Sequence, residues 1–431
     1  MQIEWLMKNW FSLLVASLLF VFAIGKYHSG MIRTDGTDLG MPYLGARAWL
    51  EGSNPYDGDN LRRIQHAADA ESFKFNLEYL PPVYPPATFV LLTPLALLNW
   101  PAAMHVWEIS AVVMLVLAIS AMLNLVGVSW RDPRAWLLVL FCIVFAPLRN
   151  AFAMGQNALP AVCLAALSAS ALRRNRDVLA GLLLAAAICL KPHDVFLFLI
   201  YFAMIGRWRA VAWAIAGVTF VAMIAILRPG LSQLGWIPDW LRWVNHAAAP
   251  GGINDPSAKG PARFQLLHFP VVLFTILQNR WLVAVLNLLI CGSLGAWTAI
   301  IIFRRRIWHR DISFEFLALS AVAVFTLVPT FHRFPDAVLL LFPMAWGMSK
   351  LGTPSESVRR ITVLLLLPFL IQPYDLIPQL YAHGIVPRTL ATVWWWRCFA
   401  RGSLVWVTLL LSCWMTFALS RDAKHLQRVK Q

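Results

Sequence analysis

Two aspartates near the amino end of the chain are candidates for a general base. Asp35 and Asp38 lie in the stretch Arg33-Thr-Asp-Gly-Thr-Asp38, which follows the first apolar segment. A carboxylate can take the proton of an attacking hydroxyl if it is held near the reacting centre with its pKa set by burial and by neighbours. The alternative is that both are solvated loop acids, as most loop aspartates are.

A second group of polar residues is mainly cationic and comes much later in the chain. Lys191-Pro-His193-Asp194 joins two apolar segments, and His332-Arg333 precedes another. An ionisable side chain at membrane depth is costly and is therefore a functional candidate. The lysine and the arginine suit a phosphate, and the histidines could hydrogen-bond the same group. The alternative is a snorkelling lysine paired with Asp194 and an arginine near lipid headgroups.

Three uncharged polar side chains could contact a substrate: two amides could hydrogen-bond its hydroxyls, and a tyrosine could stack on a ring of it. Gln156 and Asn157 stand where an apolar segment begins, and Tyr84 follows a pair of prolines. Each has a simpler explanation. Asn157 could cap a helix, Gln156 could join neighbouring helices, and Tyr84 could belong to the aromatic belt of a membrane protein.

No pattern in the sequence requires a metal or another cofactor. None of the six cysteines forms a Cys-x-x-Cys pair, so neither a cysteine metal site nor a disulfide framework is expected. No Walker loop is present, which argues against an ATP-driven pump. Pairs of His and Asp in the outer loops could in principle hold a divalent ion. Because lysine and arginine can meet the charge of a phosphate, we expect no metal and no cofactor.

The composition is that of a polytopic membrane protein. Of the 431 residues, 59% are hydrophobic and 13% are charged, which is more apolar surface than a soluble fold needs. The net charge of +15 comes from short Lys/Arg clusters between apolar segments. Their simplest role is to set topology and to attract anionic membrane lipids. No basic low-complexity arm is present, so nucleic acid is not an expected partner.

We predict an all-α protein with about twelve transmembrane helices. The predicted spans are 9–26, 101–127, 134–150, 157–172, 177–190, 193–206, 209–227, 281–303, 312–330, 335–350, 360–373 and 402–420. Twelve crossings place the basic clusters and both termini in the cytoplasm, provided that 86–98 and 269–279 do not cross alone. We therefore expect these two short segments to be re-entrant or interfacial pieces on the outer side.

Two long loops are expected on the outer side. Residues 27–85, the first outer loop, carry eight of the 21 acids, and within them 42–51 and 60–72 are amphipathic enough to lie as short surface helices. Residues 228–280 combine a mobile flap, rich in Gly, Pro and Asn, with the second re-entrant segment. We see no repeat and no separate soluble domain, so 1–431 is expected to be a single membrane domain.

Five short motifs occur in the same order as in a known enzyme family. They are Asp38-Leu-x-x-x-Tyr43-x-x-Ala46-x-x-x-Leu50-x-Gly52-x-x-Pro55-Tyr56, Leu80-Pro-Pro-Val-Tyr84-Pro85-Pro86, Gly155-Gln156-Asn157, Ala180-Gly181…Leu190-Lys191-Pro192 and Pro329-Thr-Phe-His332. Over roughly residues 30–345 the chain resembles glycosyltransferase family 87, integral-membrane enzymes of the GT-C superfamily that use polyprenyl-phosphate sugars. The last motif departs from the family's in spacing and lacks its Trp.

The resemblance implies a GT-C type bundle and an inverting sugar transfer. It places Asp38 at the aspartate of the first outer loop, the general base of such enzymes, while Asp35 falls outside the matched pattern and is the second candidate. The donor would be a polyprenyl-phosphate sugar, of mannose or else of a pentofuranose such as arabinose. Its phosphate would lie near Lys191, His332 and Arg333, although His332 could instead shape the sugar pocket. The acceptor would be a lipid or a glycan.

The resemblance also implies a location, and two other functions stay open. The chain would be a multi-pass protein of the plasma membrane, the inner membrane in bacteria, with its active site on the extracytoplasmic face. A transporter or flippase of a lipid-linked glycan would also need polar residues in a cavity. It should show matched repeats with broken helices, and the sequence shows none. The third possibility is a noncatalytic assembly factor that kept only the scaffold.

Overall fold

The protein is helical throughout the residues that can be described. A computed structural model describes residues 36–68, 70, 77, 80–228, 234–306, 312–349 and 357–428. Among these the only β contact is an isolated antiparallel bridge between Leu266 and Arg333. The all-α expectation is therefore confirmed. The expected first span, 9–26, and the candidate base Asp35 lie outside the described residues.

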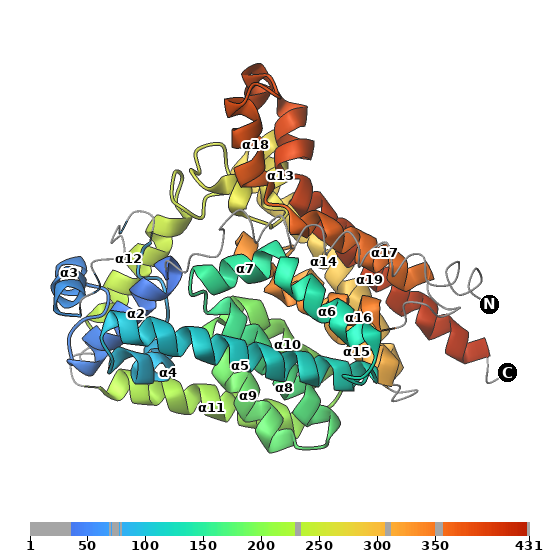
Figure 1. The fold of residues 1–431 in the computed structure, drawn as a ribbon, viewed down its shortest axis with the longest axis horizontal. Helices are drawn as coiled ribbons and strands as arrows, with labels where there is room; N and C mark the ends of the chain where they lie inside the picture. The colour runs from blue at the N-terminus through green and yellow to red at the C-terminus, as the bar shows by residue number, and fades with distance from the viewer. Residues whose placement is uncertain are drawn as a thin grey trace.

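The amino-terminal helices form one packed group, blue to green in Figure 1. They are α2 (Thr37–Leu50), α3 (Gly58–Ala67), α4 (Pro86–Ala96), α5 (Trp100–Val126), α6 (Pro133–Val144), α7 (Ala146–Ala153), α8 (Ala158–Arg173), α9 (Asp177–Leu190), α10 (Pro192–Met204) and α11 (Trp208–Leu227). Within the group α9 packs against α8 and α11, while α5 crosses α8 and α2 packs along α4.

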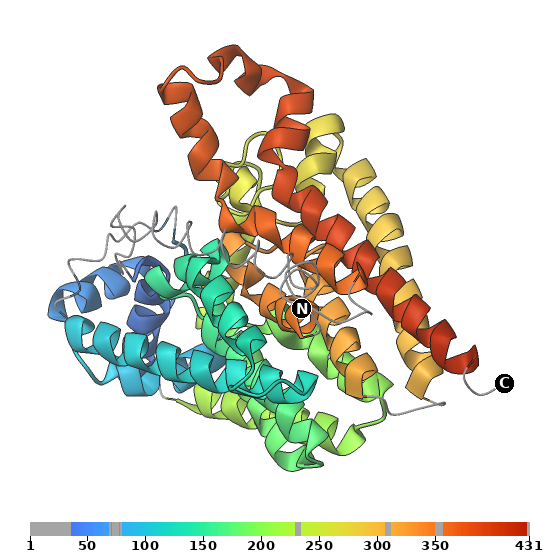
Figure 2. The ribbon, with the colours of Figure 1, turned by 45° about the vertical axis from the view of Figure 1, so that its right-hand side comes forward.

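The helix α12 (Trp236–Ala248) comes later in the chain but lies beside α2 and α3 (Figure 1), where Trp236 stacks on Tyr56. The other later elements form a second group that includes two long helices side by side, α14 and α19 (Figure 2). They are η2 (Arg263–Gln265), α13 (Pro270–Ile276), α14 (Arg280–Arg306), α15 (Ile312–Thr326), η3 (Phe334–Leu340), α16 (Leu341–Met348), α17 (Ser357–Leu366), η4 (Leu367–Leu370), α18 (Pro373–Ala382), η5 (Arg388–Thr392), η6 (Trp396–Arg401) and α19 (Ser403–Arg428). The groups meet where α15 packs on both α10 and α19.

Several helices are long and apolar enough to cross a membrane, but fewer than expected. In the described chain α5, α11, α14 and α19 qualify by length and composition, and the bent pairs α6–α7 and α17–α18 raise the number to six. The predicted span 177–190 is α9, whose 14 residues extend about 21 Å, short of a hydrocarbon core of about 30 Å. The protein is a helical polytopic membrane protein, and the count of twelve spans is not supported.

The helix α2 lies in the interior of the protein. Eleven of its 14 residues are buried, because apolar side chains surround it instead of lining one face. The expectation that 42–51 lies on the membrane surface is therefore wrong. By contrast, α3 buries Leu61 and Ile64 and leaves most of its charged side chains exposed, so within 60–72 the described helix is amphipathic.

The two long loops that were expected on the outer side are tied to each other. Residues 228–268, expected to be a mobile flap, contain α12, whose Trp240 and Trp243 indoles donate hydrogen bonds to the carbonyls of Val83 and Tyr56 at 3.0 and 2.9 Å. Of the two short apolar segments, 86–98 contains α4 and 269–279 contains α13. α4 packs against α2, α9 and α11. The flap is thus held against the loop that carries Asp38.

The turn after α7 holds the first residues of α2 in place. The amide of Asp38 donates to the carbonyl of Met154 at 2.8 Å, and that of Gly36 donates to Ala153 at 3.2 Å. Gly155 in this turn has a φ of +71°, and a Cβ added there would lie only 2.6 Å from the Cβ of Leu39. The turn therefore needs glycine for both its backbone conformation and its closeness to α2.

We predict that Gly155→Ala lowers stability more than Gly127→Ala, because only the former adds a clash to the left-handed backbone. Gly127 has the same φ of +71°, but a Cβ there would meet nothing within 4 Å. A non-glycine residue in that conformation costs roughly 1–2 kcal/mol. Thermal unfolding of the two variants in one detergent measures the difference. Equal unfolding midpoints would show that the contact with Leu39 is unimportant.

Candidate active site

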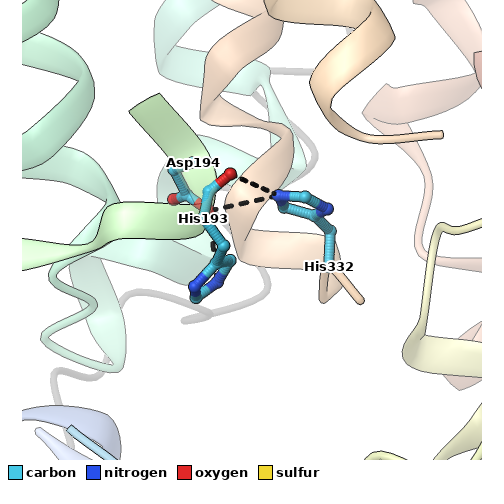
Figure 3. A group of neighbouring side chains, drawn as sticks. All are labelled: His193, Asp194 and His332. Carbon is cyan, nitrogen blue, oxygen red and sulfur yellow. Dashed lines mark hydrogen bonds and ion pairs between the residues drawn. The ribbon is translucent and has the colours of Figure 1, made fainter. Parts of the chain in front are cut away.

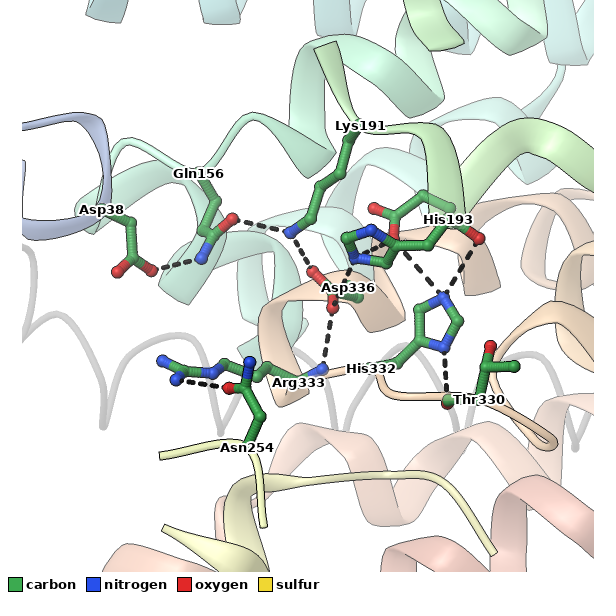
Figure 4. A network of polar contacts seen from close by, with 10 residues as sticks. Asp38, Gln156, Lys191, His193, Asn254, Thr330, His332, Arg333 and Asp336 are labelled. Carbon is green, nitrogen blue, oxygen red and sulfur yellow. Dashed lines mark hydrogen bonds and ion pairs between the residues drawn. The ribbon is translucent and has the colours of Figure 1, made fainter. Parts of the chain in front are cut away.

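Side chains from distant parts of the chain meet between the two helix groups (Figure 4). Asp38 comes from the first turn of α2, and Gln156 lies two residues before the start of α8. Lys191 is the single residue between α9 and α10. Arg333 and Asp336 come from the start of η3 in the second group. These five residues include the base and cation candidates that the sequence places far apart.

A continuous set of polar contacts links the carboxylate of α2 to the second group. The Gln156 amide nitrogen donates to Oδ2 of Asp38, and its oxygen accepts a hydrogen bond of 2.8 Å from Nζ of Lys191. Lys191 also forms an ion pair with Oδ1 of Asp336, whose other oxygen accepts a 2.7 Å hydrogen bond from the amide of Arg333. Gln156 therefore joins two charged groups of opposite sign and orients both.

These charges are buried, which makes their pairing obligatory. Asp38, Lys191 and Asp336 are 7%, 5% and 1% exposed. Burial raises the pKa of Asp38, and the nearby Arg333 and Lys191 offset this only in part. Burial alone would lower the pKa of Lys191, but the carboxylates of Asp336 and Asp194 outweigh it and raise the pKa, so Lys191 is charged. An unpaired charge at this depth would be strongly destabilising.

Asp38 and Arg333 line one polar cavity of about 180 Å³. The cavity is also lined by Asn150, Met154, Gln265, Phe334, Pro335, Tyr374 and Asp375. Arg333 is half-buried, and its guanidinium donates a hydrogen bond of 2.9 Å to Oδ1 of Asn254. This hydrogen bond fixes one side of the guanidinium beside the cavity. A carboxylate and a guanidinium that face one cavity can deprotonate a hydroxyl and bind an anionic group at the same time.

The two histidines lie beyond Asp336, on its far side from Asp38 (Figure 4), and neither lines the cavity. His332 is fully buried, with Nδ1 3.0 Å from the carbonyl of Thr330, and burial lowers its pKa. His193 is partly exposed, with Nε2 3.3 Å from the carboxylate of Asp194. The structure therefore brings both histidines near the candidate site without placing them in the cavity.

The two remaining candidates, Asn157 and Tyr84, lie outside the cavity. Asn157 is fully buried, its side chain makes no hydrogen bond within the described chain, and it does not cap α8. Burial raises the pKa of Tyr84 to about 12, so its phenol is neutral. Its backbone carbonyl accepts a 2.7 Å hydrogen bond from the hydroxyl of Tyr56.

The sequence reasoning missed residues of the second group. The position of Asp336 could have indicated its role, because a carboxylate at the start of an apolar segment needs a charged or hydrogen-bonding partner. Asn150 and Tyr374 line the cavity and hydrogen-bond each other at 2.7 Å, yet they come from two different bent helix pairs. Nothing in the sequence indicates that these bends bring their ends together.

We predict that Lys191→Met is more destabilising than the double variant Lys191→Met/Asp336→Asn. The single change leaves a buried carboxylate without its cation, which costs about 3–5 kcal/mol, and the second change removes that charge. Unfolding midpoints in detergent measure both. Arg63→Met is the control, because its ion pair with Glu51 is exposed and is worth at most about 1 kcal/mol. A double variant no more stable than the single would contradict the pairing argument.

Comparison with known proteins agrees with the order of the sequence motifs. The model of glycosyltransferase family 87 matches residues 83–330, more than half of the chain. The polyprenol-phosphate-mannose-dependent alpha-(1-2)-phosphatidylinositol mannoside mannosyltransferase of Mycobacterium tuberculosis is 26% identical over 387 residues, which cover 86% of this chain and 82% of the relative. No solved structure matches. The chain belongs to glycosyltransferase family 87 and is a membrane glycosyltransferase.

Proposed function

We propose that the protein is an inverting mannosyltransferase that moves mannose from a polyprenyl-phosphate donor to a hydroxyl of a lipid or glycan acceptor. The observation that carries the proposal is the shared cavity of Asp38 and Arg333. The mycobacterial relative is named for polyprenol-phosphate mannose, which supports the same donor here. That relative is also named for a phosphatidylinositol mannoside acceptor, which supports an acceptor in the same class of glycolipids.

In this mechanism Asp38 is the general base. One carboxylate oxygen is engaged by Gln156, which leaves the other for the acceptor hydroxyl. The acceptor oxygen attacks the anomeric carbon from the face opposite the phosphate, and its proton passes to Asp38. The bond between the anomeric carbon and the phosphate oxygen breaks, so the configuration inverts and a polyprenyl phosphate leaves. Burial supports this role, because a raised pKa makes the carboxylate a stronger base.

Arg333 is the residue that meets the leaving phosphate. Its guanidinium offers a planar set of donors, and charge that develops on the phosphate is stabilised by a cation already held in place. Asn254 provides that hold. Lys191 is a positioning residue, since its ammonium is taken up by Gln156 and Asp336 and acts on Asp38 through the glutamine. No metal is required for these steps.

The site is proposed to lie on the extracytoplasmic face of the plasma membrane, the inner membrane in a bacterium. Gln156 precedes α8, whose last residue is Arg173, while α9 starts after Arg176 and ends just before Lys191. α10 leads from the site to Arg207. Each of the three helices thus has a basic turn at the end away from the site, and basic turns favour the cytoplasm. We propose one membrane domain, 1–431.

The direct test is transfer of labelled mannose by the purified protein. The chain is incubated with radiolabelled polyprenyl-phosphate mannose and a membrane lipid extract, and labelled products are separated from the donor. A new mannosylated product supports the proposal. Absence of transfer across a panel of polyprenyl-phosphate sugars would contradict it and favour transport of a lipid-linked glycan.

We predict that Asp38→Asn reduces kcat by roughly 10²–10⁴-fold while the donor still binds, because a general base contributes about that much. Asp375→Asn is the matched control, because Asp375 is an exposed carboxylate of the same cavity. Turnover and donor affinity are measured for both variants. The base assignment is wrong if the control loses turnover and Asp38→Asn does not.

We predict that kcat/KM falls as the pH drops through a pKa above that of an ordinary aspartate, about 3.9. The base must be deprotonated, and burial raises the pKa of Asp38. Arg333→Gln should move this acid limb to higher pH, because Arg333 is the charge that most lowers that pKa. Arg63→Gln, an exposed arginine, is the control. An acid limb at the same pH in all three proteins would refute this electrostatic coupling.

A further inference from the structure

A buried carboxylate beside the proposed active site has no hydrogen-bond partner. Asp194, in the first turn of α10, is fully buried, and neither of its carboxylate oxygens accepts a hydrogen bond within the described chain. Buried carboxylates are normally hydrogen-bonded or paired with a cation. Asp336 has Lys191 for this purpose, so Asp194 needs either a proton or a positive charge of its own.

Two imidazoles face Asp194 (Figure 3). Nε2 of His193 lies 3.3 Å from its Oδ1, and Nε2 of His332 lies 3.5 Å from the same oxygen. The three side chains come from two elements, the start of α10 and the segment before η3, and one ligand atom from each lies within 4.8 Å of the other two. They are therefore three potential ligands around one point.

Each nitrogen of the His332 ring lies near a carbonyl oxygen, which can only accept a hydrogen bond. Nδ1 is 3.0 Å from the carbonyl of Thr330, and Nε2 is 3.3 Å from that of His193. The shorter contact favours the neutral ring with its hydrogen on Nδ1. In that tautomer the lone pair of Nε2 converges with oxygens of Asp194 and His193, an arrangement that a cation would stabilise.

Two of the three distances between these ligand atoms suit a tetrahedral ion of the zinc type. Bonds from Zn²⁺ to imidazole nitrogen and carboxylate oxygen are about 2.0–2.2 Å, so neighbouring tetrahedral ligands lie roughly 3.3–3.5 Å apart. The two histidine-to-aspartate distances, 3.3 and 3.5 Å, fall in this range. The nearest competing cation, Lys191, is already paired with Asp336, whose own Oδ2 lies 4.0 Å from Nε2 of His193.

We propose that His193, Asp194 and His332 bind one divalent transition-metal ion, with Zn²⁺ as the best fit. None of these residues lines the cavity of Asp38 and Arg333, so the ion lies beside the reacting groups. It would tie α10 to the segment that leads into Arg333 and Asp336, and the exposed side of His193 leaves room for a water as a fourth ligand. This goes beyond the proposed sugar transfer, which needs no metal.

The test is the metal content of the full-length protein, purified in detergent through a tag without histidine. The protein is stripped with a chelator, mixed with Zn²⁺, desalted and analysed for zinc. We expect about one zinc per chain for the wild type and at least about tenfold weaker zinc binding for Asp194→Asn and His193→Ala. Asp59→Asn and His105→Ala, which change exposed side chains, are the matched controls and should bind as the wild type does.

A second measurement distinguishes a loss of metal binding from a loss of folding. Co²⁺ in place of Zn²⁺ should give the visible absorption of a four-coordinate nitrogen and oxygen site in the wild type, and Asp194→Asn should lose it at an unchanged elution volume. Equal zinc content in the wild type and Asp194→Asn would overturn the site and leave a proton as the partner of Asp194. Zinc binding without mannose transfer would contradict only the proposed function, and transfer without zinc binding would contradict only the metal site.

Discussion

The buried ion pair between Lys191 and Asp336 is the interaction on which the candidate site depends. It joins the end of α9 to the start of η3, and so connects the two helix groups where they meet. Neither charge can be left alone at this depth, so the two groups have a strong energetic reason to adopt one relative position. Gln156 extends the same constraint to Asp38, and the amide of Arg333 extends it to the opposite wall of the cavity.

The same arrangement separates the roles of the charged residues. Lys191 and Asp336 neutralise each other and do not line the cavity, whereas Asp38 and Arg333 do. In the proposed mechanism the first pair supplies position and the second pair contacts the reactants. Reactive groups that face a cavity keep a defined geometry only where other contacts hold them. Here the hydrogen bond from Gln156 holds Asp38, and Asn254 accepts the hydrogen bond that holds Arg333.

The sequence predicted the helices better than the contacts between them. The apolar run 101–127 is α5, because a long apolar segment admits few other structures. Asp38 was proposed through its motif, and it lines the cavity. The burial of α2 was missed, since nothing in 42–51 indicates that α4 covers it. The partnership of Lys191 with Asp336 was also missed, because 145 residues separate them and only the packed helices bring them together. The span count was too high since several apolar helices are short.

Three contacts join the segment between α12 and α13 to the candidate site. Leu266 bridges to Arg333, the amide of Leu267 donates to the carbonyl of His332 at 2.9 Å, and Asn254 holds the guanidinium. The position of the cation beside Asp38 therefore depends on the segment between α12 and α13 as well as on η3, although the two are far apart in the sequence.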